Sequence, residues 1–63
     1  MRTDGEKLMT PQEVAEYLAV PQRNLYRWRA EGTGPRAAKV GKHLRYRRAD
    51  VERWLDEQAS EVA

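Results

Sequence analysis

The sequence predicts a mainly α-helical domain of three helices, with a small β-hairpin inserted before the last helix. Apolar residues recur at helical spacing in three segments, a proline separates the first two, and the period changes to that of a strand after residue 36. The chain has 63 residues, which is the size of one small domain. We expect a folded domain at residues 8–58, a flexible arm at residues 1–7 and a flexible tail at residues 59–63.

The first helix is predicted to begin with a capping box. Thr10 is placed to cap the free amides, Pro11 suits the first helical position, and Glu13 completes the box. Met9 is placed to pack on Val14 at the start of the helix. The apolar face that we expect toward the core comprises Val14, Tyr17 and Leu18.

Pro21 predicts the end of the first helix and the start of a second, basic one. Leu25 and Trp28, three residues apart, share the face that a core would cover, and Gly32 is placed to end the helix. No acidic residue occurs in this segment before Glu31, so pairing with acids one turn away does not explain its bases. The polar side chains expected to face a ligand are Gln22, Arg23, Asn24, Tyr26 and Arg27.

A β-hairpin is predicted at residues 37–46, after a glycine- and proline-rich turn at residues 32–35. The basic tip is expected at Gly41-Lys42-His43, between strands at residues 38–40 and 44–46. We expect Val40 to join Leu44 or Tyr46 in closing the core.

The last helix is predicted from Arg48 to about Gln58, with Asp50 in its first turn. Its apolar residues recur at the spacing that covers a core. The residues of the second and third helices that we expect in the core are Leu25, Trp28, Val51, Trp54 and Leu55.

Basic residues are concentrated in the middle of the chain, although the net charge is only +2. Between residues 22 and 48, nine basic residues and one acidic residue give +8, whereas the flanks carry three bases and nine acids, which give −6. The folded domain is therefore expected to have one surface suited to a polyanion and another that repels it.

The composition argues against an enzyme, a metal site and a membrane protein. There is no cysteine, His43 is the single histidine, and the one serine is Ser60 in the tail, so neither a metal-ligand cluster nor an activated nucleophile is expected. We expect no enzymatic activity and no cofactor. No apolar run approaches the ~20 residues of a membrane span and no secretory signal is present, so we expect a soluble, cytoplasmic protein.

Two short helices joined by a turn of about three residues, the second of them basic, form the pattern of a helix-turn-helix with a hairpin wing. Arginine pairs with guanine, and glutamine and asparagine pair with adenine, so the second helix is expected to read double-stranded DNA. The wing and its flanks are expected to contact phosphates or an adjacent minor groove through basic side chains. These are Arg36, Lys39, Lys42, His43, Arg45 and Arg47.

Four runs, in this order and spacing, resemble the small excisionase-type winged-helix proteins related to the DNA-binding domain of MerR regulators. They are LMTPQEVA at residues 8–15, LYRW at 25–28, VGKHLRY at 40–46 and DVERWL at 50–55. The resemblance implies a recognition helix at about residues 22–29 in the major groove and a wing at residues 42–45. Pro21 stands where the family often has a serine cap. Leu44 stands where many relatives have arginine, which weakens the case for minor-groove insertion.

The resemblance also implies a biological role. Copies of such proteins bind side by side on direct repeats, bend the DNA and contact an integrase, so that excision is favoured over integration. The same domain serves small MerR-like transcription regulators, which is the alternative, and an adaptor with an acidic protein partner is a third hypothesis. Only eight residues follow Leu55, too few for a dimerising coiled coil, so we expect a monomer that assembles on DNA.

Overall fold

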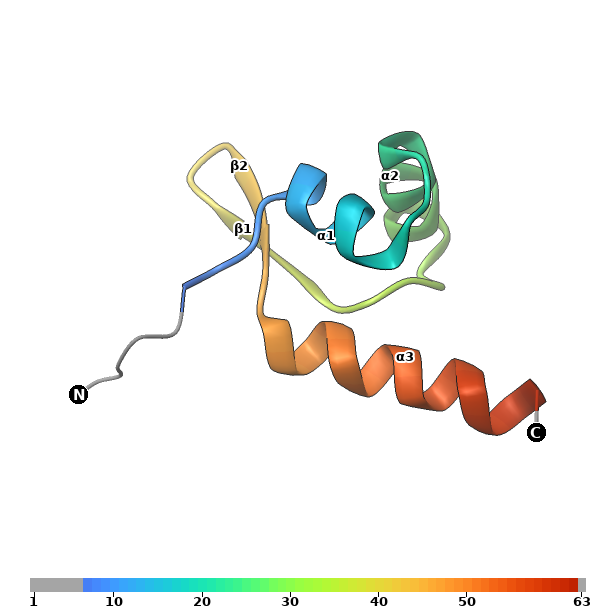
Figure 1. The fold of residues 1–63 in the computed structure, drawn as a ribbon. Helices are drawn as coiled ribbons and strands as arrows, with labels where there is room; N and C mark the ends of the chain where they lie inside the picture. The colour runs from blue at the N-terminus through green and yellow to red at the C-terminus, as the bar shows by residue number, and fades with distance from the viewer. Residues whose placement is uncertain (1–6, 63) are drawn as a thin grey trace.

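The structure, a computed structural model, describes residues 7–62 (Figure 1). Its elements in chain order are α1 (Pro11–Leu18), α2 (Gln22–Glu31), β1 (Ala37–Val40), β2 (His43–Tyr46) and α3 (Arg48–Val62). Three helices with one antiparallel hairpin confirm the predicted class, a winged helix-turn-helix. The arm predicted at residues 1–7 lies outside the described residues except for Lys7.

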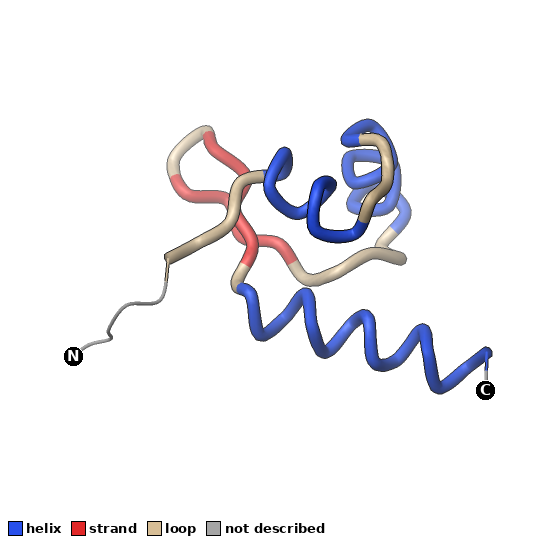
Figure 2. The backbone as a smooth tube through the Cα atoms, in the orientation of Figure 1, coloured by secondary structure: helices blue, strands red, loops and turns tan. Residues whose placement is uncertain are grey.

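The first helix occupies the centre of the arrangement. Figures 1 and 2 show α1 between the hairpin on one side and α2 on the other, with α3 running beneath them. Contacts of α1 with both α2 and β2 agree with this placement. The connecting segments are short, so each element is positioned by its neighbours in the core.

The start of α1 has the predicted capping box. The Thr10 hydroxyl accepts a hydrogen bond from the Glu13 amide at 3.1 Å, and the Glu13 carboxylate accepts one from the Thr10 amide at 2.9 Å. The helix ends at Ala19, whose φ of 60° is left-handed and turns the chain toward Pro21. This turn sets the angle between α1 and α2.

Pro21 begins α2 without a side-chain cap, as the sequence predicted. Its φ of −62° suits the start of a helix, which partly replaces the missing cap. Gly32 ends the helix with a φ of 75°, and its amide donates to carbonyls of the last turn of α2. The helix that carries the predicted ligand-facing residues therefore begins and ends at residues that the sequence identified.

The hairpin differs from the prediction by one residue at its tip. Its turn has two residues, Gly41 and Lys42, so His43 belongs to β2 and pairs with Val40. Gly41 has a φ of 66° while Lys42 has no positive φ, which is typical of a type II′ turn. Because partners across the hairpin share a face, Val40 points away from Leu44, and the prediction that Val40 closes the core was wrong: its side chain is 50% exposed.

Met9 pairs with β2 on the edge opposite β1. Its amide donates to the Tyr46 carbonyl at 2.7 Å, and the Tyr46 amide donates to the Met9 carbonyl at 2.9 Å. The sequence analysis did not foresee this bridge. It attaches the segment before α1 to the hairpin, and it places Met9 in the same core cluster as Val14.

The core is small and lies where α1, α2, β2 and the first half of α3 meet. Its buried hydrophobic residues are Met9, Val14, Ala15, Leu25, Tyr46 and Val51. Leu25 and Val51 confirm the prediction, while Trp28 and Trp54 are only half-buried. The prediction was wrong for Leu55, which is 41% exposed, and Tyr17, which was expected in the core or half-buried, is also 41% exposed.

Leu55 and Tyr17 are exposed because the rest of this small domain does not cover them. Within residues 48–60 of α3 the less exposed positions are Asp50, Val51, Trp54 and Gln58, so the helix packs on the rest of the domain along this line and Leu55 lies beside it. The ring of Tyr17 is covered on one side by the Arg48 guanidinium, 4.9 Å from its centroid. That contact joins α1 to the start of α3.

Two tryptophans connect α3 to α2. The rings of Trp28 and Trp54 lie 5.3 Å apart at 38°, and the Trp54 indole donates to the Thr33 carbonyl at 2.9 Å. Gly34 lies against the Trp28 side chain, and a Cβ added to Gly34 would lie 2.7 Å from the Trp28 Cβ. Beyond this contact α3 continues to Val62, past its predicted end near residue 58, because no glycine or proline interrupts it.

Candidate nucleic-acid interface

The exposed face of α2 is basic. Arg23, Tyr26, Arg27 and Ala30 follow the spacing i, i+3, i+4, i+7 and are all exposed, so they share one face of the helix. Leu25 on the opposite face is 1% exposed and anchors the helix in the core. The packing of α2 therefore turns its arginines outward.

The two predicted amide readers lie at the sides of this face. Gln22 is exposed, and its side-chain amide donates to the Tyr26 hydroxyl oxygen at 3.1 Å. Asn24 is half-buried, because its place on the helix turns it toward the edge of the core. Tyr26 is 49% exposed, and its own hydroxyl proton is free for an acceptor outside the domain.

A shallow groove of about 210 Å³ separates α2 from the hairpin. Its lining residues are Tyr26, Arg29, Ala30, Lys39, Lys42 and Leu44. Lys39 and Leu44 pair across the hairpin, so their face of the hairpin is the one that turns toward α2. The structure thus brings the predicted Lys39 and Lys42 together with α2, and we call α2 with this inner hairpin face the helix–wing surface.

Sequence analysis missed Arg29 as a member of the helix–wing surface. It lies one turn after Leu25, a position that suggests the buried side of the helix, yet it is exposed and lines the groove. Beneath it, burial raises the pKa of the Tyr46 phenol above its usual value of 10.0, and the positive charge of Arg29 partly opposes that rise. The excess of bases in this segment is the only sequence signal that points to Arg29.

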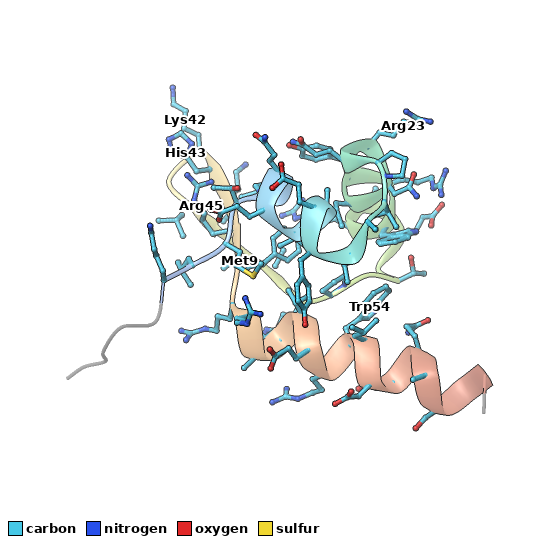
Figure 3. The ribbon with its side chains drawn as sticks, viewed as in Figure 1. Met9, Arg23, Lys42, His43, Arg45 and Trp54 are labelled. Carbon is cyan, nitrogen blue, oxygen red and sulfur yellow. The ribbon has the colours of Figure 1, made fainter. Side chains whose placement is uncertain are left out.

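The tip of the hairpin and the arginines of α2 extend to the same side of the molecule. Figure 3 shows Arg23 on α2 and Lys42 with His43 on the hairpin directed away from α3. All three side chains are exposed. A polyanion lying across this side would contact both elements.

The remaining predicted wing residues gather elsewhere. On the hairpin face opposite α2, a concave surface of about 580 Å³ includes Arg45 and exposed Val40. We call it the arginine pocket, and its charged residues are Arg36, Arg45, Arg47, Asp50 and Arg53. Arg53 comes from α3, and only the fold brings it to the hairpin. The predicted wing set is therefore divided between two surfaces.

Most acidic side chains lie outside the helix–wing surface, whose one acid is Glu31 at the C-terminal end of α2. Within residues 7–60, whose side chains are described, the ion pairs are Arg48 with Glu52 at 3.1 Å and Arg53 with Asp50 at 3.8 Å, both on α3. The exposed acids of α1 and α3 are Glu13, Glu16, Glu52, Asp56 and Glu57. Charge is thus separated between the elements, which orients the domain relative to a polyanion.

The described part of the chain lacks a metal-ligand cluster and a membrane-spanning helix. It contains no group of three or more histidine, cysteine or acidic residues that could bind a metal ion. None of its helices has the length and apolar character needed to cross a membrane. The interface consists of cationic, amide and phenol side chains, which bind anions and base edges.

Comparison with known proteins agrees with this geometry. A family model described as a helix-turn-helix domain matches residues 8–59, which include all five elements up to most of α3. No curated protein and no solved structure matches the chain.

Proposed function

Because the chain belongs to the helix-turn-helix domain family, which indicates DNA binding, we propose that it is a sequence-specific DNA-binding protein of the excisionase type. In this role it is a recombination directionality factor that performs no chemistry itself. It binds attachment-site DNA in the cytoplasm of a bacterial host, bends that DNA and contacts an integrase, so that excision is favoured over integration.

The observation that carries the proposal is the shared direction of two basic elements. Arg23 of α2 and the tip of the hairpin extend to one side of the domain, away from α3 (Figure 3), and Arg27 shares the exposed face of α2 with Arg23. A helix of this kind enters the major groove, and a hairpin beside it contacts the adjacent backbone. The hairpin carries no acidic residue, and the single acid of α2 is Glu31, at the C-terminal end of the helix beyond Arg23 and Arg27.

Specificity in the proposal comes from the first two turns of α2. Arg23 and Arg27 are exposed and suited to bidentate contacts with guanine. Gln22 holds the Tyr26 oxygen, which directs the Tyr26 proton toward a phosphate or a base acceptor. Asn24, which is half-buried, would need a change of rotamer to reach a base edge.

The hairpin contributes affinity in the proposal. Lys39 and Lys42 neutralise phosphates beside the major groove and His43 donates a hydrogen bond to one, which positions α2 without reading sequence. Leu44 lies on the inner face, so the contact is made by the cations around it. Copies of the chain bound to neighbouring repeats have the same orientation, because α2 and the hairpin tip meet the DNA from one side of the domain.

Two experiments test the proposal. Selection of binding sites from a random duplex library, followed by titration of the selected site against scrambled DNA, is expected to show a preference of at least about 10³-fold. Excision in a reconstituted integrase reaction is expected to rise when the protein is added. Binding without any effect on excision would assign the chain to promoter regulation instead, and affinity that does not change with salt would favour an adaptor for an acidic protein.

A further inference from the structure

The arginine pocket lies where DNA bound straight across the helix–wing surface does not reach. Val40 and Arg45 lie on the hairpin face that turns away from α2, because their cross-strand partners alternate with those of the inner face. Arg36 and Arg47 flank that face, and Arg53 reaches it from α3. The domain measures 37 × 23 × 19 Å, so a second basic surface on its flank is separate from the side that α2 presents.

We propose that the arginine pocket binds phosphates of the DNA segment beyond the hairpin tip, so that the duplex bends around the wing. The proposal rests on the proposed DNA binding and adds the surface that produces the bend. The DNA segment that α2 reads and the segment that the pocket binds are parts of one duplex.

The composition of the pocket is suited to phosphate. Four arginines face a single carboxylate, that of Asp50, which lies 3.8 Å from Arg53. Arginine presents a planar set of donors that matches phosphate oxygens. Four like charges on one concave surface repel each other, and an anion removes that repulsion.

Two arginines of the pocket retain free donors for such an anion. The Arg45 guanidinium donates to the Leu44 carbonyl at 2.7 Å, which fixes the side chain and leaves its other N–H groups available. The Arg53 side chain is 70% exposed despite its contact with Asp50. The pocket is therefore partly preorganised and open.

Continuity with the hairpin tip favours DNA as the occupant. Arg45 is two residues from His43 on the same face of β2, and Val40 pairs with His43 beside the turn. A duplex that contacts Lys42 and His43 continues past this tip, and a bend toward the outer face brings its next phosphates to the arginines. Several phosphate contacts offset the elastic cost of a bend over a site of this size.

The test compares two double variants that remove equal charge. R36Q/R53Q removes two cations of the pocket, and K7Q/R48Q removes two cations on the α1 side of the domain, outside both basic surfaces. The probes are a duplex of about 12 bp, which holds the site selected by the protein, and a duplex of about 30 bp with the same site at its centre. Affinity is measured over a series of salt concentrations, and bending is measured by energy transfer between dyes at the ends of the longer duplex.

On the longer duplex, R36Q/R53Q is expected to make the negative slope of log K against log salt shallower by about 2. Each lost phosphate contact lowers the magnitude of that slope by about 0.9. Energy transfer on that duplex is expected to fall toward that of free DNA. On the shorter duplex R36Q/R53Q and the wild type are expected to have equal slopes. K7Q/R48Q is expected to keep the wild-type slope and bend on both.

An unchanged slope and bend for R36Q/R53Q on the longer duplex would overturn the proposal, and so would an equal loss in K7Q/R48Q. A poly-glutamate peptide that binds the wild type but not R36Q/R53Q, with the slopes unchanged, would assign the pocket to an acidic protein instead. Circular dichroism checks that the variants fold. If the double variant is unfolded, R53Q alone replaces it, and its slope is expected to be shallower than that of the wild type by about 1. Absence of base preference would refute the proposed function, and the slopes of R36Q/R53Q and the wild type on duplexes of arbitrary sequence and the same two lengths would still test the arginine pocket.

Discussion

Alanine substitutions at Arg23 and at Lys42 distinguish two models of DNA binding. In one model α2 reads bases, and in the other the basic surface attracts DNA without reading its sequence. Arg23 lies on the exposed face of α2, and Lys42 lies in the two-residue turn of the hairpin. Each substitution removes one positive charge from an exposed site, so we expect the free energy of unfolding to change by less than about 0.5 kcal/mol. Differences in DNA binding can then be assigned to the lost contact.

The structure provides the magnitude of the salt response. Five cations that are charged at neutral pH belong to the helix–wing surface: Arg23, Arg27, Arg29, Lys39 and Lys42. If each neutralises one phosphate, log K on a short duplex is expected to fall against log salt with a slope of about −4.5. Lys42→Ala is expected to reduce this slope by about 0.9 and to weaken binding to all sequences equally.

Arg23→Ala is expected to have a different signature. It should cost about 1 to 3 kcal/mol on the selected site and remove the preference at one base pair, because a bidentate contact to a base is lost. The measurement is fluorescence anisotropy at several salt concentrations, on the selected duplex and on a set of duplexes with one base pair changed. Equal losses on every duplex for both variants would refute the assignment of α2 as the reading element.

Three further predictions concern the scaffold that positions the helix–wing surface. Gly34→Ala should destabilise the fold by about 1 to 3 kcal/mol in urea denaturation, because the new Cβ would lie 2.7 Å from the Trp28 Cβ; unchanged stability would show that the turn can move away. Leu25→Ala should cost about 2 to 5 kcal/mol, whereas Leu55→Ala should cost under about 1 kcal/mol, since Leu25 is 1% and Leu55 41% exposed; equal losses would contradict the observed packing. Burial raises the pKa of Tyr46, so its contribution to stability is complete below pH 10.0 and is lost as the pH rises from there through the folded-state pKa, by at most about 1.4 kcal/mol per pH unit. Tyr46→Phe should lack this part of the alkaline loss, and identical pH profiles of the two proteins would refute it.

Much of the fold could be predicted because its signals are local. Thr10 and Glu13 form their capping box within four residues, and Pro21 and Gly32 delimit α2 through their own backbone preferences. The exposed basic face of α2 also follows from helical spacing once Leu25 is placed in the core. These features need no knowledge of distant parts of the chain.

The side chains of the hairpin that turn toward the core could not be predicted with the same accuracy. A three-residue tip would pair Val40 with Leu44 and place both in the core, whereas the two-residue turn pairs Val40 with His43 and turns it outward. A change of one residue in the turn reverses every side chain of one strand relative to the other. The choice between these turns depends on how Leu44 and Tyr46 pack on α1 and α2.

The sequence by itself determined that α2 lies between Pro21 and Gly32 and presents a basic face, because those signals arise within one helix and its two caps. Tertiary structure alone decided that the remaining bases divide into two surfaces. Lys39 and Lys42 join α2 because their hairpin face turns toward it, while Arg45 and its neighbours meet Arg53 on the other face. Residues far apart in the chain acquire a common surface only when packing sets the register and direction of the elements that carry them.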